Sequence, residues 1–163
     1  MSLAGALHFA AIVHQFRREE QAAKEQIEST VTLSNKQGFQ FFSAIGTIDR
    51  GWVLTAQGQR EEQEEGITQI RQGLAAYQSI GAELWRPHFL SLLAEAYGKV
   101  GQAEQGLSVL DEALTTLAKT EERFYEAELY RLKGTLTLQR ERQRATGRRQ
   151  QATGTEPRSP NRS

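Results

Sequence analysis

The chain has 163 residues, with 20 basic and 20 acidic side chains and a hydrophobic share of 38%. This length suits one domain with a core, or a short run of stacked repeats. Cysteine is absent, which excludes disulfides, thiolate metal sites and thiol catalysis and fits a cytoplasmic location. No apolar run reaches the roughly 18 residues of a membrane span.

The balanced charge is unevenly distributed along the chain. Residues 1–139 hold 13 basic and 18 acidic side chains, whereas residues 140–163 hold seven arginines and two glutamates. The last segment has no apolar periodicity and is rich in Arg, Gln, Thr, Gly, Ser and Pro, a composition typical of disorder. We therefore expect a folded domain over residues 1–141 and a basic disordered tail over 142–163. The tail has no interleaved aromatic residues, so it does not indicate nucleic-acid binding.

Helical pairs are predicted along the whole folded part. The first helices of the pairs are expected over 3–16, 40–57, 83–100 and 122–141, and the second helices over 19–36, 62–79 and 103–119. Apolar residues spaced by four, such as Ile27 and Val31, mark one face of each second helix. Glycines stand where left-handed caps would end the helices: Gly38 and Gly81 after second helices, and Gly58 and Gly101 after first helices.

Small residues recur at a fixed interval, which indicates an internal repeat. The first helices carry them at Ala11, Gly51, Ala94 and Gly134, and the second helices carry them at Ala23, Gly66 and Gly106. Two helices approach closely only where neither has a bulky side chain, so each first helix should meet its second helix at these residues. The middle pair has three extra residues, which we place in a charged turn within 60–65, because loops tolerate insertions.

The segment Leu90–Ala113, LSLLAEAYGKVGQAEQGLSVLDEA, resembles a tetratricopeptide repeat. The resemblance rests on eight positions of the motif: Leu90, Leu93, Ala94, Tyr97, Gly101, Gly106, Leu110 and Ala113. The period is near 40 rather than the standard 34. The stretches GWVLTAQGQ, IRQGLAAYQSIGAELWRPHFLSLLAEAYGKVGQ and ERFYEAELYRLKGTL look like the C-terminal repeats of bacterial cyclase–ATPase, kinase or LuxR-type signalling proteins. The resemblance implies an all-α superhelix of about three and a half repeats that acts as a protein-interaction scaffold.

No motif for catalysis or for a cofactor is present. The chain has no phosphate-binding GxxxxGK[ST] loop and no GxSxG elbow. His8 and His14 are six residues apart on one helix, and His88 has no neighbouring ligand, so metal binding is not indicated. The acidic run at 61–65 has no EF-hand spacing and suits the first turn of a helix. We expect no enzyme and no cofactor or metal.

In the resembling family the first helices line a concave groove. Its groove positions correspond here to twelve residues, which we take as the candidate partner-binding site: His8, Ile12, Gln15, Ile45, Ile48, Trp52, Thr55, His88, Ser91, Glu95, Glu128 and Arg131. Trp52 has two open interpretations. Exposed beside Ile45 and Ile48, it would form an apolar hot spot, and otherwise it belongs to the core.

The expected partner is a protein or peptide segment of mixed charge, or an upstream cyclase or ATPase domain of a longer parent protein. The helix over 122–141 lacks a following partner helix, so self-association through that helix is a further hypothesis. Neither nucleic acid nor membrane is expected as a partner. The alternative function is a regulatory domain that senses a small molecule or a peptide signal in the groove. An open groove favours the scaffold, and a deep apolar cavity near Trp52 favours the sensor.

Overall fold

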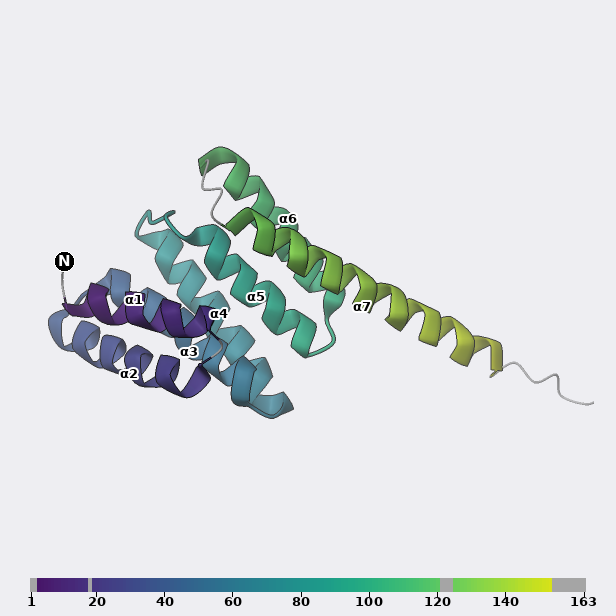
Figure 1. Cartoon of the computed structure of the whole chain (residues 1–163), viewed down its shortest axis with the longest axis horizontal. Coiled ribbons are helices and arrows are strands. Elements are labelled where there is room, and N and C mark those ends of the chain that lie inside the picture. Colours follow the sequence, from purple (N-terminus) through teal and green to yellow (C-terminus); the bar gives the residue numbers. More distant parts are fainter. Residues whose placement is uncertain (1–2, 18, 121–124, 154–163) are drawn as a thin grey trace, which may run out of the picture.

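The computed structural model describes residues 3–17, 19–120 and 125–153. These residues form seven α-helices and no strand (Figure 1). The helices are α1 (Leu3–Phe16), α2 (Glu20–Gln37), α3 (Gln40–Gln57), α4 (Arg60–Ser79), α5 (Arg86–Lys99), α6 (Ala103–Thr120) and α7 (Glu126–Thr153). The prediction of an all-α chain is confirmed. Within the described part, no helix is long and apolar enough to cross a membrane.

Each helix packs against the next one along the chain, and the odd-numbered helices also contact one another in order. The hairpins α1/α2, α3/α4 and α5/α6 are therefore joined through contacts of α1 with α3, α3 with α5, and α5 with α7. This pattern of neighbour contacts is consistent with a helical repeat. One continuous core of buried side chains runs from Ala11 in α1 to Leu136 in α7.

The small residues lie where two helix backbones come closest. A Cβ atom added to Gly51 would lie 2.5 Å from the carbonyl oxygen of Gly66, and one added to Gly66 would lie 2.6 Å from that of Gly51. A Cβ atom on Gly106 would lie 3.0 Å from the carbonyl oxygen of Ala94. These approaches confirm the predicted facing of small residues in the second and third hairpins.

The three extra residues of the middle hairpin do not form a loop, so that prediction is wrong. Helix α4 already begins at Arg60, and its first turn is fixed by a capping box between Gln59 and Glu62. The backbone N–H of Gln59 donates to the Glu62 carboxylate at 2.8 Å. Carboxylates early in a helix are favoured by the helix dipole, so the acidic run lengthens the helix instead of breaking it.

Three of the four predicted glycine caps have the left-handed backbone: Gly38, Gly81 and Gly101, with φ of 69°, 70° and 80°. Gly58 is extended, with φ −77° and ψ 159°, and so departs from the prediction. Lack of space favours glycine at this position instead, because an added Cβ atom would clash with the Leu54 carbonyl oxygen.

Helix α5 begins at Arg86 and not at residue 83. Pro87 accounts for the difference, because its ring is accepted in the first turn of a helix but clashes with the preceding turn farther inside. Trp85 precedes the helix in a left-handed conformation with φ 68°, which is rare for a bulky residue. Its ring packs against Phe9 and Tyr125, with centroids 6.0 and 6.1 Å away.

Helix α7 runs to Thr153, so the expectation of disorder from residue 142 is wrong for 142–153. The helix projects beyond the other six (Figure 1). Arg, Gln and Ala, which are frequent in residues 142–153, have good helix propensity. The expectation of disorder rested on composition and left this propensity out. Residues 154–163, the rest of the expected tail, lie outside the described residues.

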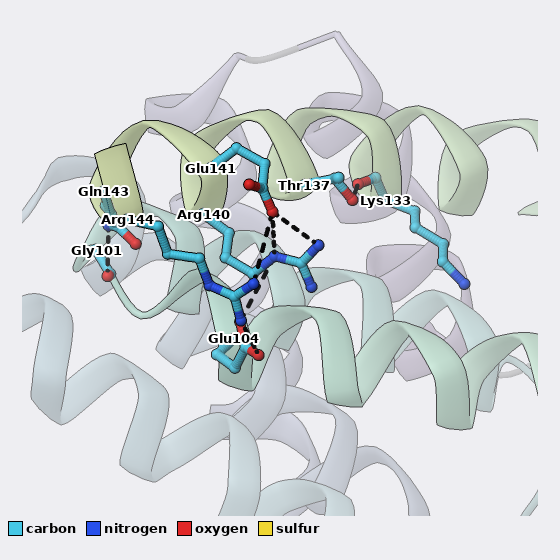
Figure 2. A network of polar contacts seen from close by, with 8 residues as sticks. All are labelled: Gly101, Glu104, Lys133, Thr137, Arg140, Glu141, Gln143 and Arg144. Carbon is cyan, nitrogen blue, oxygen red and sulfur yellow. Dashed lines mark hydrogen bonds and ion pairs between the residues drawn. The ribbon is translucent and has the colours of Figure 1, made fainter. Parts of the chain in front are cut away.

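Polar contacts fasten α7 to the turn between α5 and α6 (Figure 2). The Gln143 side-chain amide donates to the Gly101 carbonyl oxygen at 2.8 Å, as the Gln139 amide does to Gly98. Arg140 and Arg144 both reach the Glu104 carboxylate, at 3.7 and 3.2 Å. The first residues of the expected tail are therefore a continuation of the packed helix.

Candidate functional site: a cleft between α1, α5 and α7

Nine of the twelve residues assigned to the groove are buried, and two of them, Ile48 and Thr55, lie against glycines of α4. Trp52 is only 2% exposed, which settles the two interpretations in favour of the core. The nine are His8, Ile12, Gln15, Ile45, Ile48, Trp52, Thr55, His88 and Ser91. Glu95, Glu128 and Arg131 are the three that solvent reaches. The expected open groove of all twelve is therefore absent, because the odd-numbered helices pack too closely to expose these positions.

Seven of the twelve nevertheless meet in one cleft of about 520 Å³, formed by the end of α1, by α5 and by the beginning of α7, with Trp52 of α3 contributing. Gln15, Trp52, His88 and Ser91 reach it from the buried set, and Glu95, Glu128 and Arg131 from the exposed set. Phe16, Leu92, Tyr125 and Ala127 complete its lining. The cleft is the best candidate site of the described residues.

Aromatic rings line one side of the cleft as a stack. The Tyr125 ring lies against His88 at 4.7 Å and against Phe16 at 5.9 Å, with nearly parallel planes in both pairs. Phe16 is 51% exposed, so its ring is accessible. A stacked wall of this kind can hold an aromatic or long aliphatic side chain of a ligand.

A buried polar cluster lies behind the cleft. The Gln15 side-chain amide donates to Asp49 Oδ1 at 3.0 Å, and Asp49 Oδ2 lies 3.3 Å from His8 Nδ1. The second contact is a close electrostatic one without hydrogen-bond geometry. Asp49 of α3 thereby ties α1 to the middle hairpin. Asp49 is an acidic residue three positions before Trp52, which is the signal the sequence offers for it. It is not among the twelve residues assigned to the groove.

His88 is neutral at ordinary pH. Its pKa is lowered to about 4, chiefly by burial; Asp49 opposes this shift, and the electrostatic interaction with His8 adds to it. Its Nε2 atom and the Gln15 Oε1 atom are buried with no hydrogen-bond partner among the described residues. Buried polar atoms of this kind are rare, and they often mark a place where another molecule or a water supplies the missing bond.

The rim of the cleft is charged. The Arg131 guanidinium donates two hydrogen bonds to the Glu128 carboxylate, at 2.7 and 2.6 Å. These bonds raise the pKa of Arg131 above its ordinary value, and the charge of Glu95 contributes to the same shift. Glu95 is also paired with Lys99, at 3.8 Å, so the rim carries balanced charge and suits a ligand that has charged groups beside its apolar part.

An exposed apolar stripe on α1 continues the cleft. Phe9, Val13 and Phe16 lie at spacings of four and three, which places them on one face of the helix, and they are 45%, 52% and 51% exposed. Phe16 belongs to both the stripe and the cleft lining. The stripe was readable from the sequence by its spacing, but the groove positions taken from the family lie on another face of the helix.

A second hollow, of about 440 Å³, lies between α2, α3 and α4. Across it Arg50 donates two hydrogen bonds to Glu28, at 3.0 and 2.6 Å, which lower the pKa of Glu28. Arg50 and Glu28 therefore satisfy each other, and none of the predicted groove residues lies in the lining of this hollow. In the part of the chain that the structure describes, no three His, Asp or Glu side chains are grouped as metal ligands would be.

Comparison with known proteins adds no relative: no protein-family model matches the chain, and neither a curated protein nor a solved structure matches it.

Proposed function

We propose that this chain is a protein-interaction module of tetratricopeptide type, which holds a segment of a partner protein in the cleft between α1, α5 and α7. The observation that carries the proposal is the continuity of that cleft with the exposed stripe Phe9, Val13 and Phe16. Contiguous apolar surface beside a charged rim is typical of protein-binding sites. In this proposal the helical hairpins form a right-handed superhelix with the cleft on its concave side.

The chemistry of the cleft defines the partner segment. An aromatic or long aliphatic side chain would lie against Phe16 and Tyr125, with charged residues beside the rim pairs Glu128–Arg131 and Glu95–Lys99. Such a segment is an amphipathic helix or an extended stretch of mixed charge. By the sequence resemblance, the parent setting is a bacterial regulator in the cytoplasm, and an upstream cyclase or ATPase domain is one source of the segment.

A peptide selection tests this proposal. Peptides of random sequence are selected on the whole chain, and the affinities of the enriched peptides are measured for Phe16→Ala and for Leu3→Ala. Leu3 is a matched control, because it is an exposed apolar residue on the same helix and lies outside the cleft lining. We expect Phe16→Ala to weaken binding at least tenfold and Leu3→Ala to leave it unchanged. Equal binding to wild type and both variants would reject the cleft as the site.

A small-ligand sensor is the second candidate function, and a specific observation favours it. The volume of about 520 Å³ falls within the range of small-molecule sites. Two buried polar atoms at the cleft, His88 Nε2 and Gln15 Oε1, have no hydrogen-bond partner among the described residues. Screening a metabolite library for an increase in Tm distinguishes the two. A metabolite whose stabilisation is abolished by Phe16→Ala, together with no enriched peptide, would favour the sensor.

A further inference from the structure

Helix α7 repeats the small-residue position of α3 and α5 but leaves it open. Gly134 follows Ala94 by 40 residues, as Gly51 follows Ala11. At Gly51 an added Cβ atom would meet the Gly66 carbonyl oxygen at 2.5 Å, whereas at Gly134 it would meet nothing within 4 Å. Among the described residues, the position at which α3 packs against α4, and α5 against α6, therefore has no neighbour on α7.

The side chains around Gly134 form an exposed face opposite to the buried one. Leu129, Leu132 and Leu136 face the core, while Tyr130 and Leu138, four residues on either side of Gly134, are 57% and 61% exposed. Tyr130, Gly134 and Leu138 lie in one row of the helix, because residues four apart are neighbours on its surface. A glycine between two large apolar residues permits a second helix to approach closely.

Charge is unevenly distributed along α7: Arg131 and Lys133 balance the two glutamates of its first half, whereas in its second half a single glutamate, Glu141, stands among arginines. Glu126 and Glu128 lie in its first turn. Five arginines follow in its second half: Arg140, Arg142, Arg144, Arg148 and Arg149. Glu126 and Arg142 each lie eight residues from Gly134, so a second α7 in the opposite direction would place Arg142 of one copy opposite Glu126 of the other, at both ends of the contact. In a parallel pair, like charges would face each other.

We propose that two copies of this chain associate through α7, antiparallel and centred on Gly134. In this arrangement Leu138 of one copy packs near Tyr130 of the other, and the two Gly134 residues meet at the twofold axis. The proposal rests on the row Tyr130, Gly134 and Leu138, none of which lines the α1/α5/α7 cleft, so it does not depend on the proposed function.

A matched pair of variants tests the association. Gly134→Gln and Gly147→Gln both replace a glycine of α7 that has open space around it, and both substitutions raise helix propensity to the same extent. Only the first would obstruct the twofold contact. Light scattering coupled to size exclusion is expected to give twice 18.3 kDa for the full chain and for Gly147→Gln, and 18.3 kDa for Gly134→Gln.

Cross-linking tests the register, since the chain has no cysteine of its own. Under mild oxidation, Gly134→Cys should form a disulfide-linked dimer, and Gly147→Cys should form at least tenfold less at the same concentration. A monomeric wild-type chain would overturn the proposal, as would a dimer that persists in Gly134→Gln. A monomer that binds a hydrophobic dye at Tyr130 and Leu138 would also overturn it, and would assign this face to a helix of another protein.

Discussion

The middle hairpin α3/α4 and the terminal helix α7 have the same repeat position and opposite surroundings. Around Gly51 the backbones of α3 and α4 are so close that no side-chain atom fits, while Gly134 of α7 faces open space. The same small residue thus allows a close helix contact in the middle hairpin and leaves open space on α7 among the described residues.

Removing Asp49 should have the largest effect. Asp49→Ala would leave Gln15 and His8 buried without their shared partner, and should lower the free energy of unfolding by roughly 3 to 5 kcal/mol. Asp49→Asn keeps an acceptor for Gln15 and should cost less than half of this. Chemical denaturation of both variants measures the difference, with Asp111→Ala, which alters an exposed carboxylate, as control. A loss of stability no larger than that of Asp111→Ala would contradict the role of the cluster.

Acidification should destabilise the chain through His88. Its pKa is about 4 in the folded chain and 6.5 in a model peptide. As the pH falls below 6.5, the unfolded chain takes up a proton that the folded chain refuses until about pH 4. Stability is therefore fully present above pH 6.5 and is lost across that window, by roughly 3 kcal/mol at most.

Unfolding free energies of wild type and His88→Phe across pH 4 to 7 check this expectation. The variant should lack the portion of the pH dependence that comes from His88. Identical pH profiles for the two chains would show that His88 already titrates normally in the folded state.

The substitution Gly51→Ala should lower the free energy of unfolding by roughly 2 kcal/mol, because α3 and α4 would have to separate. The added methyl group would lie 2.5 Å from the Gly66 carbonyl oxygen and 2.9 Å from the Ile70 backbone nitrogen, and backbone atoms cannot rotate away. Thermal and chemical unfolding both report the change. A neutral effect would mean that the hairpin opens without cost.

The same substitution in α7 should have the opposite sign. Gly134→Ala adds a methyl group in open space and replaces the poorest non-proline helix former by the best, so it should stabilise α7 by about 1 kcal/mol. The free energy of unfolding should be measured at a protein concentration low enough to keep the chain monomeric. Destabilisation there would show that Gly134 is needed within the single chain.

The smallest effect is expected at the ion pairs that fasten α7. Glu104→Ala removes the contacts of Arg140 and Arg144 (Figure 2). These side chains are largely exposed, so the loss should stay below about 1 kcal/mol and decrease further at high salt. Amide hydrogen exchange in α7 is the sensitive measurement. Unchanged exchange rates beyond residue 140 would contradict the fastening role.

The sequence predicted the helices well where spacing governs them. The bounds of α1 and α3 agree with the expected 3–16 and 40–57, because the apolar face and the end of each helix were both visible. It failed where a local effect decided the outcome: Pro87 delayed α5, and the capping box of Glu62 extended α4. It also failed for 142–153, where helix propensity and contacts with Gly101 and Glu104 outweighed a disorder-like composition.

The site was predictable only in part. The groove positions implied by the family resemblance include residues that do meet at one cleft, among them His88, Glu95 and Arg131. Spacing cannot tell how closely α1, α3 and α5 pack, and that closeness buries Trp52 and most of the expected groove. The contribution of Tyr125, and the role of Phe16 in joining the cleft to the stripe on α1, depend on tertiary contacts that no local pattern contains.

The most direct test of the proposed cleft uses the two tryptophans of the chain, Trp52 and Trp85. Their indole N–H resonances are followed by NMR while an enriched peptide is added, and Trp85→Phe assigns the Trp52 signal. Trp52 lines the cleft, so its resonance should shift saturably with the same affinity as the binding measurement. A peptide that binds the chain while the Trp52 resonance stays in place would contradict the assignment of the cleft as the binding site.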